Sequence, residues 1–211
     1  MSRRMTEKGL CIVVSAPSGS GKSSICRRLL AACPDMEFSV SFTSRPPRPS
    51  EINGKDYHFI SREDFQRRID QGEFAEWVEN YGEFYGTSGR ALQDVLHRGK
   101  DLLLDIEPRG AKEMKKKSQE GVFVFVLPPS LDELLKRLQK RGHETPEAIQ
   151  KRFTQAESEL GEVLWYDYAV INEDLDTAVG QLVAIYQAEK CRTSRLRGTM
   201  DYLYPLIKKE V

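Results

Sequence analysis

Apolar and polar residues form blocks along the chain that predict repeated strand–helix units. Four apolar runs have the length and composition of buried strands, and segments with helical spacing of apolar residues lie between them. The runs are Leu10–Val14, Leu102–Ile106, Val122–Leu127 and Tyr168–Ile171. Repeated units of this kind indicate an α/β fold with a parallel sheet, whose ligands gather at the carboxyl ends of the strands.

Helix signals follow these runs. Apolar spacing predicts helices over about 21–32, 89–99, 109–117 and 175–188. Two more helices open with capping residues, at Ser130 and at Thr145, where Pro146 follows at the first helical position. The helix after Ser130 has an apolar stripe predicted to face the core, made by Leu131, Leu134, Leu135 and Leu138. Its other face is basic, which is typical of a solvated helix face.

The segment from residue 38 to 87 has a different pattern. Phe38–Thr43 alternates strictly, so Phe38, Val40 and Phe42 are predicted to face a core and Ser39, Ser41 and Thr43 a wet surface. Glu51–Ile60 reads as a hairpin with Asn53-Gly54 as its turn. Ser61 then opens a short helix that Gly72 ends, and two strand-like pieces follow at 74–78 and 84–87. Short hairpins between long α/β units suggest an insertion on the sheet.

A glycine-rich turn, Ser15–Ser24 (SAPSGSGKSS), joins the first strand to the first helix. Gly19 and Gly21 allow the backbone N–H groups to turn inward, and the positive end of the helix dipole points at the same place. This arrangement suits a phosphate, with Lys22 as a mobile cation and the Ser23 hydroxyl as a Mg²⁺ ligand. A flexible linker is the alternative, but a linker would not lie between a strand and an amphipathic helix. The predicted ATP-binding residues are Ala16, Pro17, Ser18, Gly19, Ser20, Gly21, Lys22, Ser23 and Ser24, with Ala16 standing where the pattern has glycine.

A second candidate for anion binding is the proline-rich stretch Arg45–Pro49. Prolines fix φ, so they hold Arg45 and Arg48 near one another before a ligand arrives. The same stretch also fits a PxxP peptide for a proline-recognition module. The ordered signals that follow directly favour the first interpretation.

Length, charge and cysteines narrow the class of protein. The 211 residues suit one domain, and 32 basic against 32 acidic residues give no overall attraction to nucleic acid or membrane. No apolar run approaches the ~20 residues of a membrane span, and the first residues lead into a core strand instead of a signal sequence. Cys11, Cys26, Cys33 and Cys191 have no metal-ligand spacing, so a reduced, cytoplasmic protein is expected.

The acceptor of the phosphate must be inferred from other residues. Asn53-Gly54-Lys55-Asp56 is not the Asn-Lys-x-Asp base-reading motif of GTPases, and a motor or helicase would normally need a longer chain. Arginines and tyrosine hydroxyls in the 38–87 segment suit a phosphate monoester, and its carboxylates suit the N1–H and amino donors of guanine. These residues are Arg45, Arg48, Glu51, Tyr57, Glu76 and Tyr85.

The sequence resembles the guanylate kinase family over nearly the whole chain up to about Arg192. Several separated motifs in the same order carry the resemblance: Ser15–Ser24, Ser44–Arg48, Glu51–Tyr57, Glu73–Trp77, Tyr85–Thr87 and Leu104–Ile106. The resemblance implies a three-layer P-loop core with a parallel sheet, an inserted GMP-binding subdomain made of a small mixed sheet and a helix, and a helical lid. It also implies a cytoplasmic nucleoside monophosphate kinase that transfers the γ-phosphoryl group of ATP to GMP with Mg²⁺, for GMP recycling and guanine nucleotide supply.

The resemblance also implies a division of the single domain 1–211. The core would comprise 8–37, 88–139 and 162–192, the GMP-binding insertion 38–87 and the lid 140–161. The tail at 193–211 has no readable motif. ATP and GMP would be the only partners expected, without nucleic acid or membrane, and the choice between monomer and homo-oligomer stays open.

Roles of single residues follow from the same resemblance. The GMP phosphate would be held by Arg45, Arg48, Tyr57 and Tyr85, and guanine would be read by Ser41, Glu76 and Thr87. Glu51 and Asp105 complete the predicted GMP-binding set, and Ser23 and Asp105 would hold Mg²⁺, the latter through water. Lys22, Arg45 and the lid arginines Arg137, Arg141 and Arg152 are the predicted catalytic residues. Without the resemblance, the lid arginines would be read as a solvated face.

One departure and two rival functions remain. The family usually has a carboxylate, an aromatic residue and glutamine where this chain has Glu107-Pro108-Arg109-Gly110, so the role of Glu107 near the base and the helix start stay open. A catalytically inactive interaction module of guanylate-kinase type is one rival, which the intact Lys22-Ser23 pair and both arginines disfavour. A P-loop kinase for another phosphorylated acceptor is the second, which Glu76 together with Ser41 disfavours.

Overall fold

A parallel five-stranded sheet forms the centre of the computed structural model, which describes residues 8–80, 82–117, 121–140, 145–196 and 198–200. The strand order is β2-β7-β1-β8-β9, and every pairing in it is parallel. All five strands therefore end at one edge of the sheet. Their bounds are β1 Cys11–Ser15, β2 Met36–Phe38, β7 Asp101–Asp105, β8 Val122–Leu127 and β9 Tyr168–Ile171.

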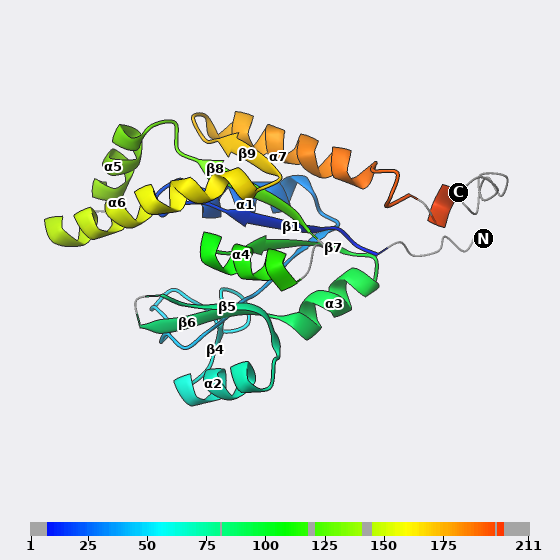
Figure 1. Ribbon diagram of the computed structural model, residues 1–211, viewed down its shortest axis with the longest axis horizontal. Helices are drawn as coiled ribbons and strands as arrows, with labels where there is room; N and C mark the ends of the chain where they lie inside the picture. Colours follow the sequence, from blue (N-terminus) through cyan, green and yellow to red (C-terminus); the bar gives the residue numbers. More distant parts are fainter. Residues whose placement is uncertain (1–7, 81, 118–120, 141–144, 197, 201–211) are drawn as a thin grey trace.

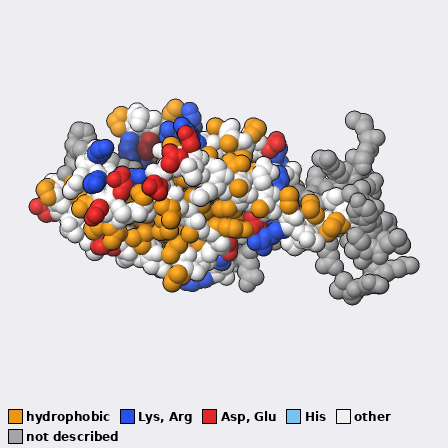
Figure 2. Space-filling view, turned by 90° about the horizontal axis from the view of Figure 1, so that it is seen from above, with side chains coloured by type: hydrophobic (Ala, Val, Ile, Leu, Met, Phe, Trp, Pro, Cys, Tyr) orange, Lys and Arg blue, Asp and Glu red, His pale blue; other side chains and the backbone are white. Residues whose placement is uncertain are grey.

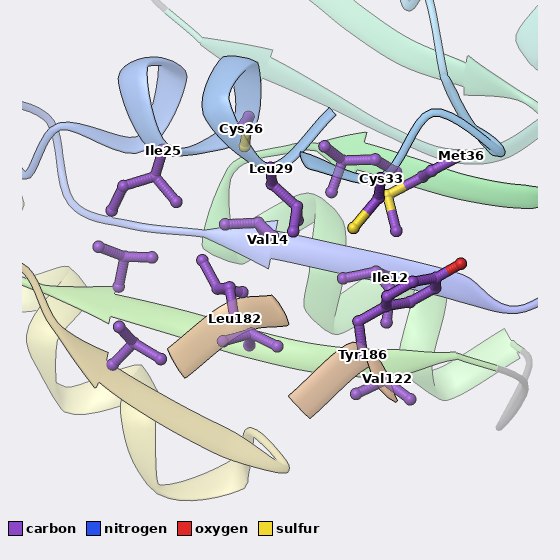
Figure 3. Packing of buried hydrophobic residues seen from close by; sticks show 14 of the residues in the cluster. Ile12, Val14, Ile25, Cys26, Leu29, Cys33, Met36, Val122, Leu182 and Tyr186 are labelled. Carbon is purple, nitrogen blue, oxygen red and sulfur yellow. The ribbon is translucent and has the colours of Figure 1, made fainter. Parts of the chain in front are cut away.

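Helices cover both faces of this sheet and make three layers (Figure 1). Helices α1 (Lys22–Ala32) and α7 (Leu175–Lys190) share a buried cluster with one face. Figure 3 shows Ile25 and Leu29 of α1 pointing toward Val14 of β1. Helices α3 (Gly89–His97) and α4 (Pro108–Lys117) pack on the other face together with the 3₁₀ helix η1 (Gly161–Trp165). The predicted α/β fold class is confirmed.

A separate four-stranded sheet lies between β2 and β7 in the sequence and beside the large sheet in space (Figure 1). Its order is β4-β3-β6-β5, and helix α2 (Arg62–Asp70) covers it. The Phe65 ring of α2 stacks on Phe74 at 4.5 Å and on Phe84 at 5.2 Å, which gives the small sheet its own core. The strands are β3 Phe42–Thr43, β4 His58–Phe59, β5 Phe74–Asn80 and β6 Glu83–Ser88.

Helices α5 (Leu131–Gln139) and α6 (Pro146–Leu160) pack on each other through Leu134, Leu138 and Ala156. The capping predictions for them are confirmed: the Ser130 hydroxyl accepts from Glu133 N–H at 3.1 Å and the Thr145 hydroxyl from Ala148 N–H at 3.3 Å. Leu131, which was predicted to face the core, is 42% exposed, because the first turn of α5 lies beyond the contact with α6.

Two predictions for the inserted segment are wrong. Phe38–Thr43 is not one strand, because its start pairs with β7 in the large sheet and its end with β6 in the small one. The predicted burial is reversed at the two ends: Phe38 is 39% exposed, whereas Thr43 is fully buried and its hydroxyl donates to the Phe84 carbonyl at 2.9 Å. Phe42 packs against the core of the small sheet as predicted. The predicted hairpin at Glu51–Ile60 is not formed, because β4 pairs in parallel with β3. The residues before β4 make a tight turn with one isolated bridge, between Asn53 and Tyr57.

Within the described parts of the chain, no helix combines the length and the apolar character needed to cross a membrane.

Candidate active site

The turn between β1 and α1 has the backbone that its glycines predict. Gly19 and Gly21 have φ values of 94° and 89°, a region that L side chains rarely adopt. Gly21 ends the turn as the N-cap of α1, so the first N–H groups of the helix remain available to an anion. Ala16, which stands where the motif has glycine, is buried in the same core cluster as Ile25.

Lys22 and Asp105 form an ion pair beside this turn, with Lys22 Nζ 2.5 Å from Asp105 Oδ1. Asp105 is the last residue of β7 and lies opposite Val14 of β1 in the parallel register. Lys22 is the first residue of α1, which follows β1 through the glycine-rich turn. The end of β7 and the start of α1 therefore bring the two charged side chains together. Lys22 Nζ also donates to the Ile106 carbonyl at 3.1 Å. Burial alone would lower the Lys22 pKa, but Asp105 outweighs it and the pKa lies above its usual value. Lys22 is therefore a fixed cation at neutral pH.

Arg45 is held by Glu51 in the small-sheet segment. Its two terminal nitrogens donate to the two oxygens of Glu51 at 2.9 and 2.8 Å. These hydrogen bonds are the main cause that raises the Arg45 pKa and lowers the Glu51 pKa. The Arg45 guanidinium lies 5.6 Å from the centre of the Tyr57 ring, and burial raises the Tyr57 pKa, so this hydroxyl remains a donor. The cluster suits a dianionic phosphate.

Glu76 is a buried carboxyl group at the other end of the same segment. Its side chain is on β5, it is 3% exposed, and its Oε1 accepts from the Thr87 hydroxyl at 2.6 Å. Burial raises the Glu76 pKa to about 7, Thr87 opposes this effect and the nearby Glu107 adds to it. A carboxyl group so placed can read the donors of a bound base.

Two cavities meet at the carboxyl edge of the large sheet. The smaller, of about 260 Å³, brings together eight of the predicted GMP-binding residues and Lys22, Ser23 and Glu107. Those eight are Ser41, Arg45, Arg48, Glu51, Tyr57, Glu76, Tyr85 and Asp105. Thr87 is buried and does not line this cavity, but its hydroxyl donates to Glu76.

The larger cavity, of about 860 Å³, follows the glycine-rich turn and helix α6. It is lined by every predicted ATP-binding residue except Ser20, which is buried and whose carbonyl accepts from Asn172 Nδ2 at 2.7 Å. The two cavities share five lining residues: Lys22, Ser23, Arg48, Tyr85 and Glu107. Ligands in the two cavities would therefore meet at Lys22.

The predicted lid arginines are only partly brought to this junction. Arg152 of α6 lines the larger cavity and donates to the Ser18 hydroxyl at 2.6 Å. Arg137 of α5 bonds Glu133 at 3.0 Å and the Asn172 carbonyl at 3.2 Å. Arg141 lies outside the described residues. Acidic and basic side chains are intermingled toward the α5–α6 end in Figure 2, so this surface is not uniformly basic.

A family model described as guanylate kinase matches residues 8–189. The chain belongs to the guanylate kinase family. It is 55% identical to a guanylate kinase of Syntrophus aciditrophicus over 92% of this chain and 95% of that protein, and 45% identical to one of Syntrophotalea carbinolica over 96% of each. The crystal structure of guanylate kinase from Anaplasma phagocytophilum matches with a TM-score of 0.77 at 31% identity, over 95% of this chain and 97% of that one.

Membership of the guanylate kinase family confirms the resemblance read from the sequence. At the point where the chain departs from the family pattern, α4 begins at Pro108, and Glu107 precedes it with Oε1 accepting from Asn80 Nδ2 at 2.7 Å. Proline suits the first position of a helix, where its missing N–H is not needed. The departure therefore leaves both the helix and the carboxylate in place.

Some residues of the site were not found by sequence reasoning. Asn172, the residue after β9, donates to the glycine-rich turn at the Ser20 carbonyl, and a Cβ on Gly21 would lie 2.4 Å from its Nδ2. Glu159 of α6 lines the larger cavity, and burial raises its pKa. Asn80 lines the same cavity and holds Glu107. None of these lies in a local motif, so only the tertiary fold shows them.

Proposed function

We propose that this chain transfers the γ-phosphoryl group of ATP to GMP at the junction of the two cavities, giving ADP and GDP. The reaction and the enzyme class, a nucleoside monophosphate kinase, follow from membership of the family. The placement of the substrates and the roles of single residues are the substance of the proposal. It is supported above all by the shared wall at Lys22, where one cavity lined by the phosphate-binding turn meets another lined by paired arginines and a buried carboxyl group.

The guanine base would occupy the small cavity against Glu76. An ionised carboxylate accepts from the N1–H and the amino group of guanine, whereas adenine presents a lone pair at N1. With adenine the buried Glu76 carboxylate would face an acceptor and would lack the two donors of the base. The loss of these hydrogen bonds costs about 1–3 kcal/mol or more. Ser41 lines the same cavity and Thr87 fixes one oxygen of Glu76. The phosphate of GMP would then reach Arg45, Arg48, Tyr57 and Tyr85.

Lys22 would sit between the two phosphates that react. It is cationic, it is held by Asp105 at 2.5 Å, and it belongs to both cavities. Phosphoryl transfer needs mainly positioning and neutralisation of charge, so no covalent intermediate with the protein is required. Arg152, already at Ser18, would add a second cation from α6. The larger cavity would hold the ATP phosphates on the N–H groups of the turn.

The residues beside Lys22 fit a magnesium ion. Mg²⁺ prefers oxygen ligands and is usually bound by one or two carboxylates, waters and substrate phosphates instead of an all-protein cage. Ser23 and Asp105 supply a hydroxyl and a carboxylate in the small cavity. The described residues contain no cluster of three or more His, Cys, Asp or Glu side chains that could bind a metal alone. When bound, Mg²⁺ would neutralise charge on the ATP phosphates.

The proposed division of labour assigns the small sheet and α2, within 38–87, to GMP and the 140–161 segment to a lid. Arg137 and Arg152 belong to α5 and α6, which share a buried cluster of their own. Closure of such a lid would exclude water and prevent hydrolysis of ATP. Arg152→Ala should therefore lower kcat more than it raises KM for either substrate.

The deciding experiment measures ADP release from Mg-ATP with GMP, AMP, CMP or UMP at equal concentrations. Turnover with GMP should exceed that with the other three by at least about 10²-fold. Glu76→Gln should raise KM for GMP by about 10- to 100-fold and leave KM for ATP unchanged. Glu79→Gln is a matched control, because Glu79 lies on the exposed face of the same strand and pairs with Arg62 at the surface. Equal turnover with all four acceptors would refute the proposal, and equal losses for GMP and ATP would refute the role of Glu76.

A further inference from the structure

Helix α4 presents a glycine to the Glu76 carboxyl group. Gly110 is the third residue of α4 and is buried. A Cβ built on it would lie 2.3 Å from Glu76 Oε2 and 3.2 Å from Glu76 Cδ. Real Cβ atoms essentially never approach another heavy atom within 3.0 Å. The carboxyl group of Glu76 thus occupies the volume that any other residue at position 110 would fill.

The backbone gives no other reason for glycine at this position. Gly110 does not have the left-handed φ of Gly19 or Gly21. Inside a helix, glycine is about 1 kcal/mol less favourable than alanine. The next neighbour of the built Cβ, Val78 Cγ1 at 3.7 Å, is at ordinary contact distance. Among the atoms nearest to that Cβ, only those of Glu76 come closer than ordinary contact distance.

Glu76 is consequently positioned from two sides. Thr87 on β6 donates to Oε1 at 2.6 Å, and the bare Cα of Gly110 on α4 lies against Oε2. The side chain is 3% exposed and lines the small cavity, so the space into which it could shift is the volume proposed for the base. A shift that relieves Oε2 would disturb the hydrogen bond at Oε1 or the approach of a base.

We infer that Gly110 is a specificity-determining positioning residue, which lets the Glu76 carboxylate sit at the depth where guanine is read. The inference rests on the proposed role of Glu76 in binding GMP. Gly110 acts through Glu76 and itself touches no substrate. Gly110 belongs to α4, which packs on the large sheet, whereas Glu76 belongs to β5 of the small sheet. The position of α4 would therefore set how the small sheet reads guanine.

The test begins with Gly110→Ala. Because a misplacement of about 1 Å at a binding group can cost about 10²-fold, KM for GMP should rise by about 10- to 100-fold while KM for ATP changes less than about twofold. Gly180→Ala is the matched control: Gly180 is in helix α7 and a Cβ there has no neighbour within 4 Å. That variant should leave both KM values unchanged. An unchanged KM for GMP in Gly110→Ala, or a parallel loss for GMP and ATP, would overturn the inference.

A second variant separates positioning from a general effect on the fold. Glu76→Asp shortens the side chain by one methylene and withdraws the carboxyl group from Gly110. In that background, Gly110→Ala should cost GMP binding less than about twofold, against at least about tenfold in the native background. An equal cost in both backgrounds would count against the inference. If Gly110→Ala alone fails to fold, the Glu76→Asp background must restore folding.

Failure of this inference is distinguishable from failure of the proposed function. If Glu76→Gln weakens GMP and Gly110→Ala does not, Glu76 reads the base without help from the glycine and only the inference falls. If neither variant affects GMP, the proposed role of Glu76 falls with it.

Discussion

The Glu51 carboxylate binds the Arg45 guanidinium through two parallel hydrogen bonds of 2.8 and 2.9 Å. The same carboxylate accepts from the backbone N–H of Arg48 at 2.7 Å. One acidic side chain therefore fixes both the direction of one arginine and the backbone of the other. Glu51 was predicted to bind GMP, and this geometry gives it a role through the two arginines.

Glu51→Gln should raise KM for GMP by about tenfold and leave KM for ATP unchanged. The substitution keeps the size of the side chain but removes the charge that orients Arg45, and charge-assisted hydrogen bonds contribute roughly 1.5–3 kcal/mol, less where solvent screens them. Steady-state kinetics with each substrate varied in turn provides the measurement. Glu73→Gln, which removes a more exposed pair with Arg68, is the control and should change neither KM. A fall in kcat without a change in KM for GMP would contradict the role given to Glu51.

The pKa of Glu76 predicts that GMP binding depends on pH. Burial raises this pKa to about 7, so the carboxyl group is mostly neutral at pH 6 and ionised at pH 8. Guanine requires the ionised form, so affinity for GMP should rise by up to about tenfold per pH unit below 7 and level off above it. Two charged side chains act on the Glu76 pKa: Glu107 raises it and Lys117 lowers it.

The phosphate of GMP also titrates, near pH 6, so the profile needs a control. Glu76→Gln keeps the phosphate contribution and should lose the part that Glu76 adds. The sign for stability is the reverse of that for binding: a carboxyl group whose pKa is raised on folding makes the protein less stable as pH rises from about 4.5 to about 7. Thermal unfolding should show that decline in the native chain and a smaller one in the variant. Identical binding profiles for both proteins would exclude Glu76 as the titrating group.

Local signals predicted four of the five strands of the large sheet and the helices beside them, but not β2. The caps at Ser61, Ser130 and Thr145 are satisfied within three residues, so the sequence alone contains their partners. The glycine-rich turn is equally local. By contrast, the fate of Phe38–Thr43 depends on β7 and β6, which lie more than 40 residues away along the chain. Alternation therefore predicted extended chain, but neither its division between β2 and β3 nor the sheet that takes each end.

Site residues divide in the same way. Lys22, Arg45 and Glu76 lie in motifs, and their types reveal their chemistry. Gly110 lies against Glu76, which is 34 positions away in the sequence. Asn172 donates to the carbonyl of Ser20, which is 152 positions away. Neither Gly110 nor Asn172 lies in a distinctive sequence motif. The sequence shows only a glycine within a predicted helix at position 110, and its contact with Glu76 depends on the packing of α4 on β5.

Substitution of Phe65 tests whether the small sheet binds GMP independently of the large sheet. The Phe65 ring is fully buried between Phe74 and Phe84, and the large sheet has a different core. Phe65→Ala should cost about 3–5 kcal/mol of local stability. Amide hydrogens of β5 and β6 should then exchange faster and GMP binding should fall steeply, while ATP binding is kept. Leu164→Ala, at a residue 92% exposed, is the control. Loss of ATP binding together with GMP binding would contradict the division.

The pair Lys22–Asp105 allows the structural and the catalytic role of a lysine to be separated. Lys22→Met should lower kcat by about 10²- to 10³-fold, because a cation that neutralises the transferring group is lost. It also leaves Asp105, whose side chain is 17% exposed, without its partner at 2.5 Å, which should destabilise the fold by about 1–3 kcal/mol.

Adding Asp105→Asn to Lys22→Met removes the stranded charge. Denaturant unfolding of the double variant should show much of the stability restored, whereas kcat should be no higher than in Lys22→Met and should fall further if Asp105 holds Mg²⁺. The reason is that the amide relieves the unpaired charge but supplies no cation to the phosphates. Recovery of activity together with stability would mean that Lys22 serves only to neutralise Asp105, and the head-to-tail arrangement of ATP and GMP around Lys22 would then lack its central charge.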